Sequence, residues 1–472
     1  MQSFFLRSLF GFYLFVSAAN TFSQAPALLP VERFSEAIQI ETVSHSDSFL
    51  IAYDNYTRFL HFLKRSYPLT HEHLQPKAIN KYSLLFSWQG SNKSQLPILY
   101  MAHYDVVPVD SSTIDNWKEQ PFSGIISDGF IWGRGTVDDK IGIIGLMEAC
   151  ERLLQENHQP QRSVYIAFGH DEEIGGRKGA LAISNYLKEQ NIFLEAVIDE
   201  GGAIAKDIFP GLDKPVALIG TAEKGDMNVL LLVEDGGGHS SAPHENTAIY
   251  ILSEALTRLK NNPMPLRLTD PTRQMLKFVT PHLDGKTRFA VKNMWLFKKK
   301  ILKKMSGNNV TNALVRTVIT PTIIRGGVKE NALPNNAMAS VNIRTLPGDS
   351  LGNVLEHIRK TINNSNIRII VTGSRTEASP VSSSESQPYH AMKKIIQEHF
   401  PEAIVSPVLS IGASDSRHFS RLSNNVLRFI PVVIEDEEKQ MIHGYNERIS
   451  IAGFEKAMQF YYELIKKMDG IE

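Results

Sequence analysis

The sequence has almost no cysteine, since Cys150 is the single one among 472 residues. One thiol cannot form an internal disulfide or a cluster of thiolate ligands, so disulfide scaffolds and thiolate metal sites are excluded. The chain also has no excess charge of one sign, because 50 Lys and Arg residues balance 50 Asp and Glu residues. No overall field attracts a polyanion, and we expect no nucleic-acid partner.

One common catalytic signature is missing as well. No Gly-x-x-x-x-Gly-Lys-Ser/Thr motif occurs, which argues against a P-loop enzyme. The 42% hydrophobic and 21% charged residues are ordinary for a soluble globular protein, and the length suffices for two domains.

The one notable apolar run lies at the N-terminus, from Leu9 to Val16, after Arg7 and before the small residues 17–19. A basic start, a short apolar run and small residues predict a secretory signal peptide over residues 1–19. We therefore expect an exported protein, periplasmic or secreted. A retained anchor is the alternative, but the run is short for a hydrocarbon layer of about 30 Å.

The rest of the chain predicts an α/β fold with an inserted α+β module. Apolar strand-like runs alternate with helical patterns over residues 27–222, with strands at 97–102 and 163–168 and a helix at 141–154. The second region, residues 223–380, has strands at 228–233, 337–343 and 367–371 and helices at 248–259 and 351–362. Residues 381–472, with helices at 389–400 and 452–467, are expected to rejoin the first region.

Polar residues with metal-binding chemistry follow the predicted strands of the first region. His103 and Asp105 come directly after the first strand and share one face, which suits a metal ligand and a carboxylate that orients its imidazole. Alone, this pair is explained as well by a hydrogen-bonded core histidine. The glycine-rich turn 133–140 adds Asp138 and Asp139 at a helix start, where one acidic residue is ordinary but two are not.

Two further strand ends carry carboxylates. The segment 170–173 contains Glu172 and Glu173, and a third apolar run ends in Asp199 and Glu200. Ligands in such sheets gather at the carboxyl ends of the strands, so these groups are expected at one edge. They would repel one another unless positive charge lies nearby, and a pair of metal ions would provide it.

In these motifs the chain resembles the aminoacylase and carboxypeptidase S family of metallopeptidases, peptidase M20. The resemblance runs from about residue 31 to the end and rests on the motifs at 103–105, 133–140 and 172–173 in this order and spacing. It implies a zinc-peptidase-like catalytic domain, a mixed sheet sandwiched by helices, formed by residues 27–222 and 381–472. Residues 223–380 would be the inserted lid or dimerisation domain, lengthened by a helical insertion at about 263–312.

The resemblance also implies a set of metal ligands. One zinc ion would be bound by His103, Asp138 and Asp199, and the other by Asp138, Glu173 and His443, with Asp138 as the bridge. The third carboxylate stays open between Asp199 and the adjacent Glu200. Two zinc ions per chain are expected, although cobalt or manganese suits the same ligands.

The expected reaction is hydrolysis of an amide bond in N-acyl amino acids or short peptides. Glu172 would act as the general base towards water held by the two metals, and Asp105 would fix His103. In the lid, His239 in the segment 236–243 would stabilise the oxyanion. Asn331, Arg344 and Gly412 would bind the substrate, with the Arg344 guanidinium suited to a free carboxylate.

Several alternatives remain open. The same machinery would serve a carboxypeptidase or dipeptidase, and a non-catalytic metal-binding protein is a rival of another class. The basic amphipathic stretch 294–304 indicates either weak contact with a membrane surface or a fatty-acyl group, or an ordinary helix with a solvated face. Lid modules of this kind also leave the choice between a monomer and a homodimer.

Overall fold

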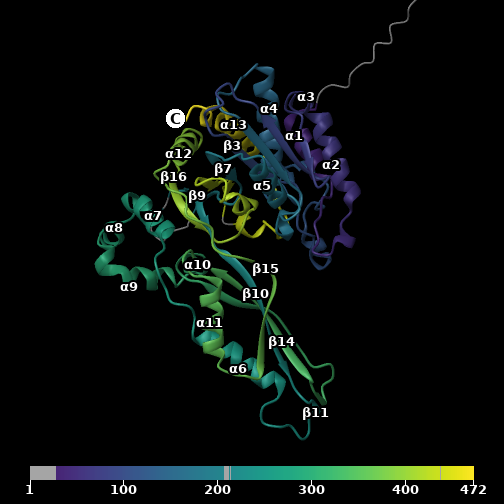
Figure 1. Cartoon of the computed structure of the whole chain (residues 1–472), viewed down its shortest axis with the longest axis vertical. Coiled ribbons are helices and arrows are strands. Elements are labelled where there is room, and N and C mark those ends of the chain that lie inside the picture. The colour runs from purple at the N-terminus through teal and green to yellow at the C-terminus, as the bar shows by residue number, and fades with distance from the viewer. Residues whose placement is uncertain (1–27, 207–211, 213, 436, 472) are drawn as a thin grey trace, which may run out of the picture.

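The computed structural model describes residues 28–471 except 207–211, 213 and 436, so the predicted signal peptide lies outside the described residues. The chain forms a larger body around a mixed sheet and a smaller body around a separate antiparallel sheet (Figure 1). The predicted α/β fold with an inserted α+β module is therefore confirmed. No helix among the described residues combines the length and the apolar character needed to cross a membrane.

Among the residues that the structure describes, the larger sheet has ten strands, and its centre is parallel. β3 lies between β6 and β7 and runs parallel to both, while β2 is antiparallel to β6. Its strands in spatial order are β1 (Lys77–Ile79), β2 (Ser83–Trp88), β6 (Val164–Gly169), β3 (Ile98–His103), β7 (Ala196–Asp199), β17 (Val426–Arg428), β9 (Val216–Glu223), β8 (Ile204–Ala205) and β18 (Val433–Ile434), with β16 (Ile404–Ser410) paired to β9.

Helices cover both faces of this sheet, which explains why the β3 run is apolar throughout. Alternate β3 residues face opposite sides, so Tyr100 packs in the large core and Leu99 in the smaller core beneath α5. Gly145 allows a close approach between two helices, since a Cβ there would lie 2.3 Å from Cδ2 of Tyr461. The helices of this body are α1 (Pro30–Ile38), α2 (Tyr53–Ser66), α3 (Pro68–Leu74), α4 (Lys140–Gln155), α5 (Ala180–Glu189), α12 (Gln387–His399) and α13 (Ile451–Met468).

The smaller body is an antiparallel sheet with helices on one face. In β10 buried residues alternate with partly exposed ones, which is the expected signature of a sheet covered on one side. The order is β12 (Val318–Gly326), β14 (Asn336–Thr345), β10 (Gly225–Glu234) and β15 (Ile367–Thr376), and α6 (Ala248–Asn261) and α11 (Leu351–Ile362) supply the cover. The chain enters this body at Glu223 and leaves it at Ser379, where the two segments are hydrogen-bonded to each other.

The predicted insertion is helical, and it shares a hydrophobic core with β9 and β16 of the larger sheet. It contains α7 (Asp270–Val279), α8 (Gly285–Lys292), α9 (Met294–Met305) and α10 (Asn309–Val315). α7 packs on β16 of the larger sheet, and α8 and α9 project to one side (Figure 1). Two small sheets complete the fold: β19 (Arg448–Ser450) with β5 (Phe130–Trp132) and β4 (Ile126–Ser127), and β11 (Gly238–His239) with β13 (Ala332–Leu333).

Candidate active site

The strand ends place the predicted metal ligands at one edge of the larger sheet. His103 is the last residue of β3, and Glu173 lies in the single turn η3 (Glu172–Ile174) just beyond β6, the neighbouring strand. Asp138 precedes α4, and His443 arrives from the segment between β18 and β19. The structure thus brings together four of the five predicted ligands from parts of the chain that lie far apart.

The distances within this cluster are short. Nε2 of His103 lies 3.0 Å from Oδ1 of Asp138, and Nε2 of His443 lies 3.1 Å from Oδ2 of Asp138 and 3.2 Å from Oε1 of Glu173. Ligand atoms of His103, Asp138 and Glu173 all lie within 4.8 Å of one another. The two oxygens of Asp138 therefore face different imidazoles, which is the arrangement required of a bridging carboxylate.

The charges of the cluster favour cations at this position. Hydrogen bonds to Asp138 and Glu173 raise the pKa of His443 to about 10. Although burial opposes it, hydrogen bonds to the two imidazoles hold the pKa of Asp138 well below its usual range. Carboxylates that stabilise positive charge so strongly, together with imidazole nitrogens that bind a metal once they are deprotonated, form a donor set suited to zinc. The residues present therefore fit the expected metal.

Asp105 holds the turn that carries Glu172 and Glu173. Its Oδ1 accepts a hydrogen bond from the Glu172 N–H at 3.0 Å, and its Oδ2 accepts one from the Glu173 N–H at 3.2 Å. Nδ1 of His103 lies 3.0 Å from the main-chain oxygen of Asp105 and 3.5 Å from its Oδ1. Asp105 thus touches His103, as expected, and also orients the turn of the proposed base.

Glu447 connects the loop of Asp138 to the segment of His443, a role that the sequence did not indicate. Its Oε2 pairs with Nη1 of Arg134 at 2.6 Å, and its Oε1 accepts hydrogen bonds from the N–H groups of Gly135 and Val137. The loop held in this way also contains a cis peptide bond, between Asp138 and Asp139. The position of Glu447, four residues after His443 in the same motif, was the available signal.

Glu172 lines the cavity beside the cluster without joining its hydrogen bonds. Burial raises its pKa well above the usual range, and the carboxylates of Asp415 and Glu173 add to this effect. Asp415 was also missed by the sequence analysis. Both of its carboxylate oxygens are buried and have no hydrogen-bond partner among the described residues. A Cβ at Gly176 would lie 1.8 Å from Oδ1 of Asp415, so this close approach requires glycine.

The two candidates for the third carboxylate differ in their surroundings. Asp199 is buried, and its Oδ2 accepts a hydrogen bond of 2.7 Å from the Ser416 N–H. Glu200 instead lines the cavity together with Asp138 and Glu172. Burial and the neighbouring carboxylates raise the pKa of Glu200 well above its usual range. Glu200 therefore faces the place where a ligand would bind.

The cavity has a volume of about 850 Å³ and lies where the two bodies meet. The smaller body contributes Arg344, whose Nε lies 3.2 Å from Oδ1 of Asp226. Gly412 lines the same cavity from the segment after β16. Two of the three predicted substrate-binding residues thus lie in the cavity that contains the metal cluster.

His239 and Asn331 lie elsewhere. His239 belongs to β11, at the far end of the smaller body from the larger sheet (Figure 1). The main-chain oxygen of Asn331 accepts a hydrogen bond from the Ser240 N–H, so the two predicted residues are neighbours. Both are exposed. Within one chain, the structure brings them to each other and not to the metal cluster.

Comparison with known proteins assigns the chain to a family. The profile of Peptidase family M20/M25/M40 matches residues 99–467. The chain belongs to this family. It is an M20 metallopeptidase or amidohydrolase, as its motifs predicted, and the cluster of His103, Asp138 and Glu173 is its candidate metal site.

Relatives of this M20 enzyme cover most of its length. It is 38% identical over 442 residues to a probable carboxypeptidase S-like 2 of Dictyostelium discoideum, covering 93% of this chain and 85% of the relative. It is also 38% identical over 456 residues to the N-fatty-acyl-amino acid synthase/hydrolase of Homo sapiens, covering 95% of this chain and 90% of that relative. The fold matches the crystal structure of an M20 family metallo-carboxypeptidase of Sulfolobus solfataricus with a TM-score of 0.70 at 20% identity. The match covers 93% of this chain and 99% of the other.

Proposed function

We propose that this enzyme hydrolyses the amide bond of N-acyl amino acids. The observation that carries this proposal is the shared cavity of Arg344 and the metal cluster. An arginine binds a carboxylate through paired hydrogen bonds, so a substrate with a free α-carboxylate would be held with its amide bond towards Asp138. The similarity to an N-fatty-acyl-amino acid synthase/hydrolase supports the same substrate class.

Glu172 is the proposed general base. It lies beside the cluster in a buried position that raises its pKa, and this favours uptake of a proton from water and its transfer to the leaving nitrogen. Asp105 keeps Glu172 in place through the hydrogen bond to its N–H. Two zinc ions, when bound, polarise the amide carbonyl and lower the pKa of water.

The residues proposed to bind these ions are His103, Asp138, Glu173 and His443, with Glu200 as the fifth. Glu200 is preferred to the predicted Asp199 because it lines the cavity, whereas Asp199 accepts a hydrogen bond from Ser416. Replacement of Glu200 by alanine should therefore lower the zinc content measured by mass spectrometry more than replacement of Asp199. The reverse order would restore Asp199 as the ligand.

Carboxypeptidase or dipeptidase activity is the second candidate, because such substrates also end in a carboxylate and one relative is a carboxypeptidase S-like protein. A hydrolysis screen separates the two. N-acetyl and N-fatty-acyl amino acids should be cleaved with higher kcat/KM than dipeptides of the same C-terminal residue, and a chelator should abolish all activity. Cleavage of dipeptides alone would favour the peptidase. Activity unaffected by the chelator would contradict both.

We also propose that two copies assemble, so that His239 of each copy reaches the site of the other. His239 is exposed and lies far from the metal cluster of its own chain, which supports this arrangement. β12 is an edge strand with Ile323 and Ile324 exposed, and such an edge can pair with a second copy. Mixing inactive Glu172→Gln and His239→Ala proteins should then restore part of the activity. A fully active monomer in sedimentation would exclude this assembly.

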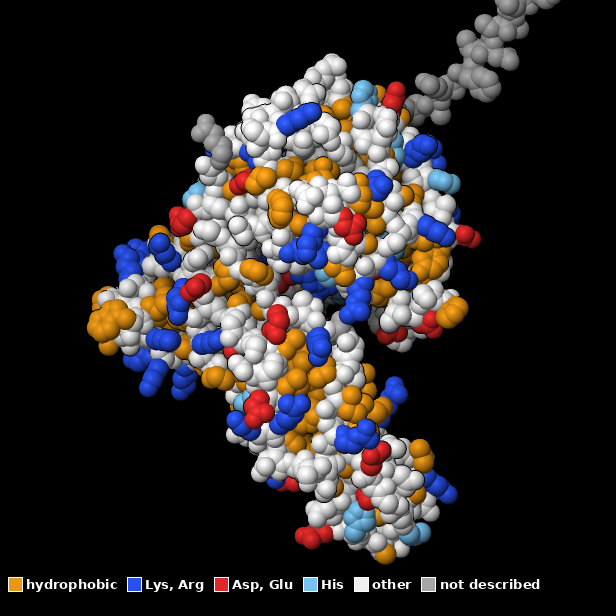
Figure 2. Space-filling view, viewed as in Figure 1, with side chains coloured by type: hydrophobic (Ala, Val, Ile, Leu, Met, Phe, Trp, Pro, Cys, Tyr) orange, Lys and Arg blue, Asp and Glu red, His pale blue; other side chains and the backbone are white. Residues whose placement is uncertain are grey.

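Export from the cytoplasm and contact with a membrane are further proposals. The projection formed by α8 and α9 carries three exposed hydrophobic side chains, Phe289, Trp295 and Leu296, of which Trp295 is 83% exposed. Figure 2 shows hydrophobic side chains at the tip of this projection with basic side chains around them. Apolar side chains framed by lysines suit an anionic lipid surface. This supports the predicted membrane contact of the stretch 294–304.

A further inference from the structure

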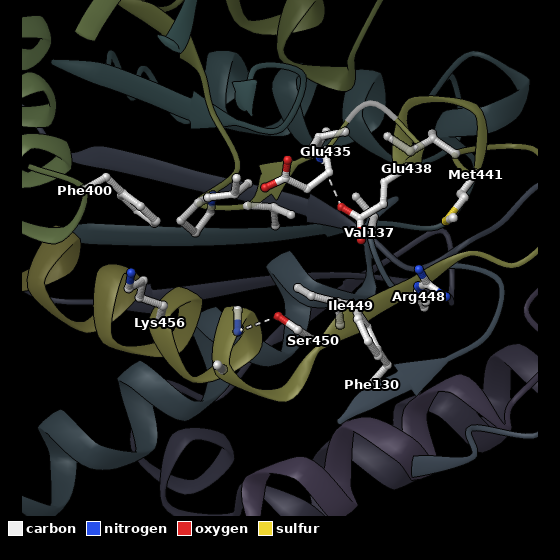
Figure 3. A pocket seen from close by; sticks show the side chains of 17 residues that line it. Phe130, Val137, Phe400, Glu435, Glu438, Met441, Arg448, Ile449, Ser450 and Lys456 are labelled. Atoms are coloured by element: carbon white, nitrogen blue, oxygen red, sulfur yellow. Dashed lines mark hydrogen bonds between the residues drawn. The ribbon is translucent and has the colours of Figure 1, made fainter. Parts of the chain in front are cut away.

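A second cavity, of about 370 Å³, lies beside the metal site. It is bounded by the segment around β18, by the first turns of α13 and by β5, and Figure 3 shows Val137 and Ile449 among the side chains around it. Most of its lining is hydrophobic. The volume falls within the range of about 300–1,000 Å³ that is typical of small-molecule sites.

This second cavity adjoins the cavity of the metal cluster. Val137, Ile434 and Ile442 line both of them. Val137 directly precedes Asp138, and Ile442 directly precedes His443. A ligand with its polar end at the cluster could therefore continue past these three side chains into the hydrophobic space.

The charged residues of the lining are engaged with other protein groups. Nζ of Lys456 lies 5.1 Å from the centre of the Phe400 ring, and the Arg448 guanidinium lies 4.4 Å from the centre of the Phe130 ring. The two acidic residues are engaged as well: Oε1 of Glu435 lies 2.8 Å from Nζ of Lys206, and Oε2 of Glu438 accepts a hydrogen bond from the Glu435 N–H. The lining thus favours an uncharged, apolar occupant.

We propose that this second cavity binds the aliphatic chain of a long-chain N-acyl group during hydrolysis. The inference rests on the proposed function and narrows its substrate class to long-chain N-acyl amino acids. The carboxylate end would contact Arg344, and the chain would leave the cluster past Val137 and Ile442. Each methylene buried from water strengthens binding about fourfold, so several methylenes give a large preference over an acetyl group.

Ala452 offers a way to fill this cavity without touching the catalytic residues. It is the second residue of α13, lines the cavity and is exposed, so a larger side chain should be tolerated by the fold. The test is kcat/KM of the zinc-loaded enzyme for N-acetyl-, N-octanoyl- and N-oleoyl-leucine. Ala452→Phe should lower the value for the oleoyl substrate at least about tenfold and leave the acetyl substrate within about twofold. Glu455→Phe, on the same helix but outside the lining, is the matched control and should change neither value.

Equal losses for both substrates, or no loss for the oleoyl substrate, would overturn this inference while leaving the proposed function intact. If the wild-type enzyme cleaves no N-acyl amino acid of any length, the proposed function fails instead. Calorimetric binding of dodecanoate to the zinc-loaded enzyme then still tests the cavity. Binding that is lost in Ala452→Phe and kept in Glu455→Phe supports it, and binding that is unchanged in both variants contradicts it.

Discussion

Asp138 connects the two halves of the proposed metal site. Each of its carboxylate oxygens lies within 3.1 Å of a different imidazole, His103 on one side and His443 on the other. Glu447 fixes the loop on which Asp138 lies by accepting hydrogen bonds from three main-chain N–H groups of that loop, those of Gly135, Val137 and Asp138. The position of one aspartate thus depends on a segment about 300 residues further along the chain.

The adjacent residues Glu172 and Glu173 are expected to have different roles, and substitution of each residue tests this expectation. Glu172→Gln should keep its zinc content but lose at least about a hundredfold in kcat, because glutamine cannot accept the proton. Glu173→Gln is the matched control and should lose zinc, because Glu173 faces His443 within the cluster. Metal analysis and kinetics of both proteins give the answer. A Glu172→Gln protein with normal turnover would remove Glu172 as the base.

The sequence allowed prediction of those site residues whose type and local position carry the signal. His103 and Glu173 follow buried strands, and their chemistry is evident from their neighbours in the chain. Glu447 and Asp415 could not be assigned in this way, because their roles depend on partners that only the folded chain supplies. The sequence alone could not decide whether Asp199 or Glu200 is the metal ligand. Adjacent residues at a strand end point in different directions, and only the folded chain shows which direction leads to the site.

At the scale of secondary structure elements, a buried ion pair holds the junction between the two bodies. Arg428 ends β17 and Glu223 ends β9, and Nε of Arg428 lies 2.6 Å from Oε1 of Glu223. The same Oε1 accepts hydrogen bonds from N–H and Oγ of Ser414, in the segment that also carries Gly412. Removal of one partner would leave the other charge buried without compensation.

We expect Arg428→Met to lower the free energy of unfolding by about 3–5 kcal/mol, measured by urea denaturation of the zinc-loaded enzyme. The matched control is Arg273→Met, which breaks an exposed pair with Asp270 and should cost less than about 1 kcal/mol. A cost for Arg428→Met no larger than that of the control would show that this ion pair does not hold the junction.

Many of the longer elements were predicted from local patterns, but their order in the sheet was not. The helix expected at 351–362 is α11, and the strand expected at 97–102 corresponds to β3 with both ends shifted by one residue. β17 escaped prediction because it has three residues, and it pairs with β7, which lies over 200 residues earlier. β12 also escaped, because most of its residues are exposed and its alternation is weak.

At the scale of the whole molecule, the resemblance to the M20 family predicted roles for two lid residues but did not show where those residues lie in the fold. His239 and Asn331 match lid positions of the family, yet the structure places them at the far end of the smaller body. Arg344 belongs to the same body but lies at its base, within the cavity. Whether a lid residue serves its own chain or a second copy depends on assembly, and a single sequence contains no record of that.

The projection of α8 and α9 predicts a measurable affinity for anionic membranes. Replacement of Lys298, Lys299 and Lys300 by alanine should weaken binding to phosphatidylserine vesicles by about two orders of magnitude, since each lysine contributes about 1 kcal/mol near such a surface. The matched control replaces three exposed lysines of the smaller body, Lys260, Lys329 and Lys360, and should bind as before. Equal binding by all three proteins in a sedimentation assay would end the membrane proposal.

Anomalous diffraction at the zinc edge, from crystals of the active enzyme, tests the central claim most directly. We predict two peaks about 3.5–4 Å apart, with Asp138 between them, His103 bound to one ion, and Glu173 and His443 bound to the other. An active crystalline enzyme with no peak at Asp138, or with His443 bound to neither ion, would contradict the account.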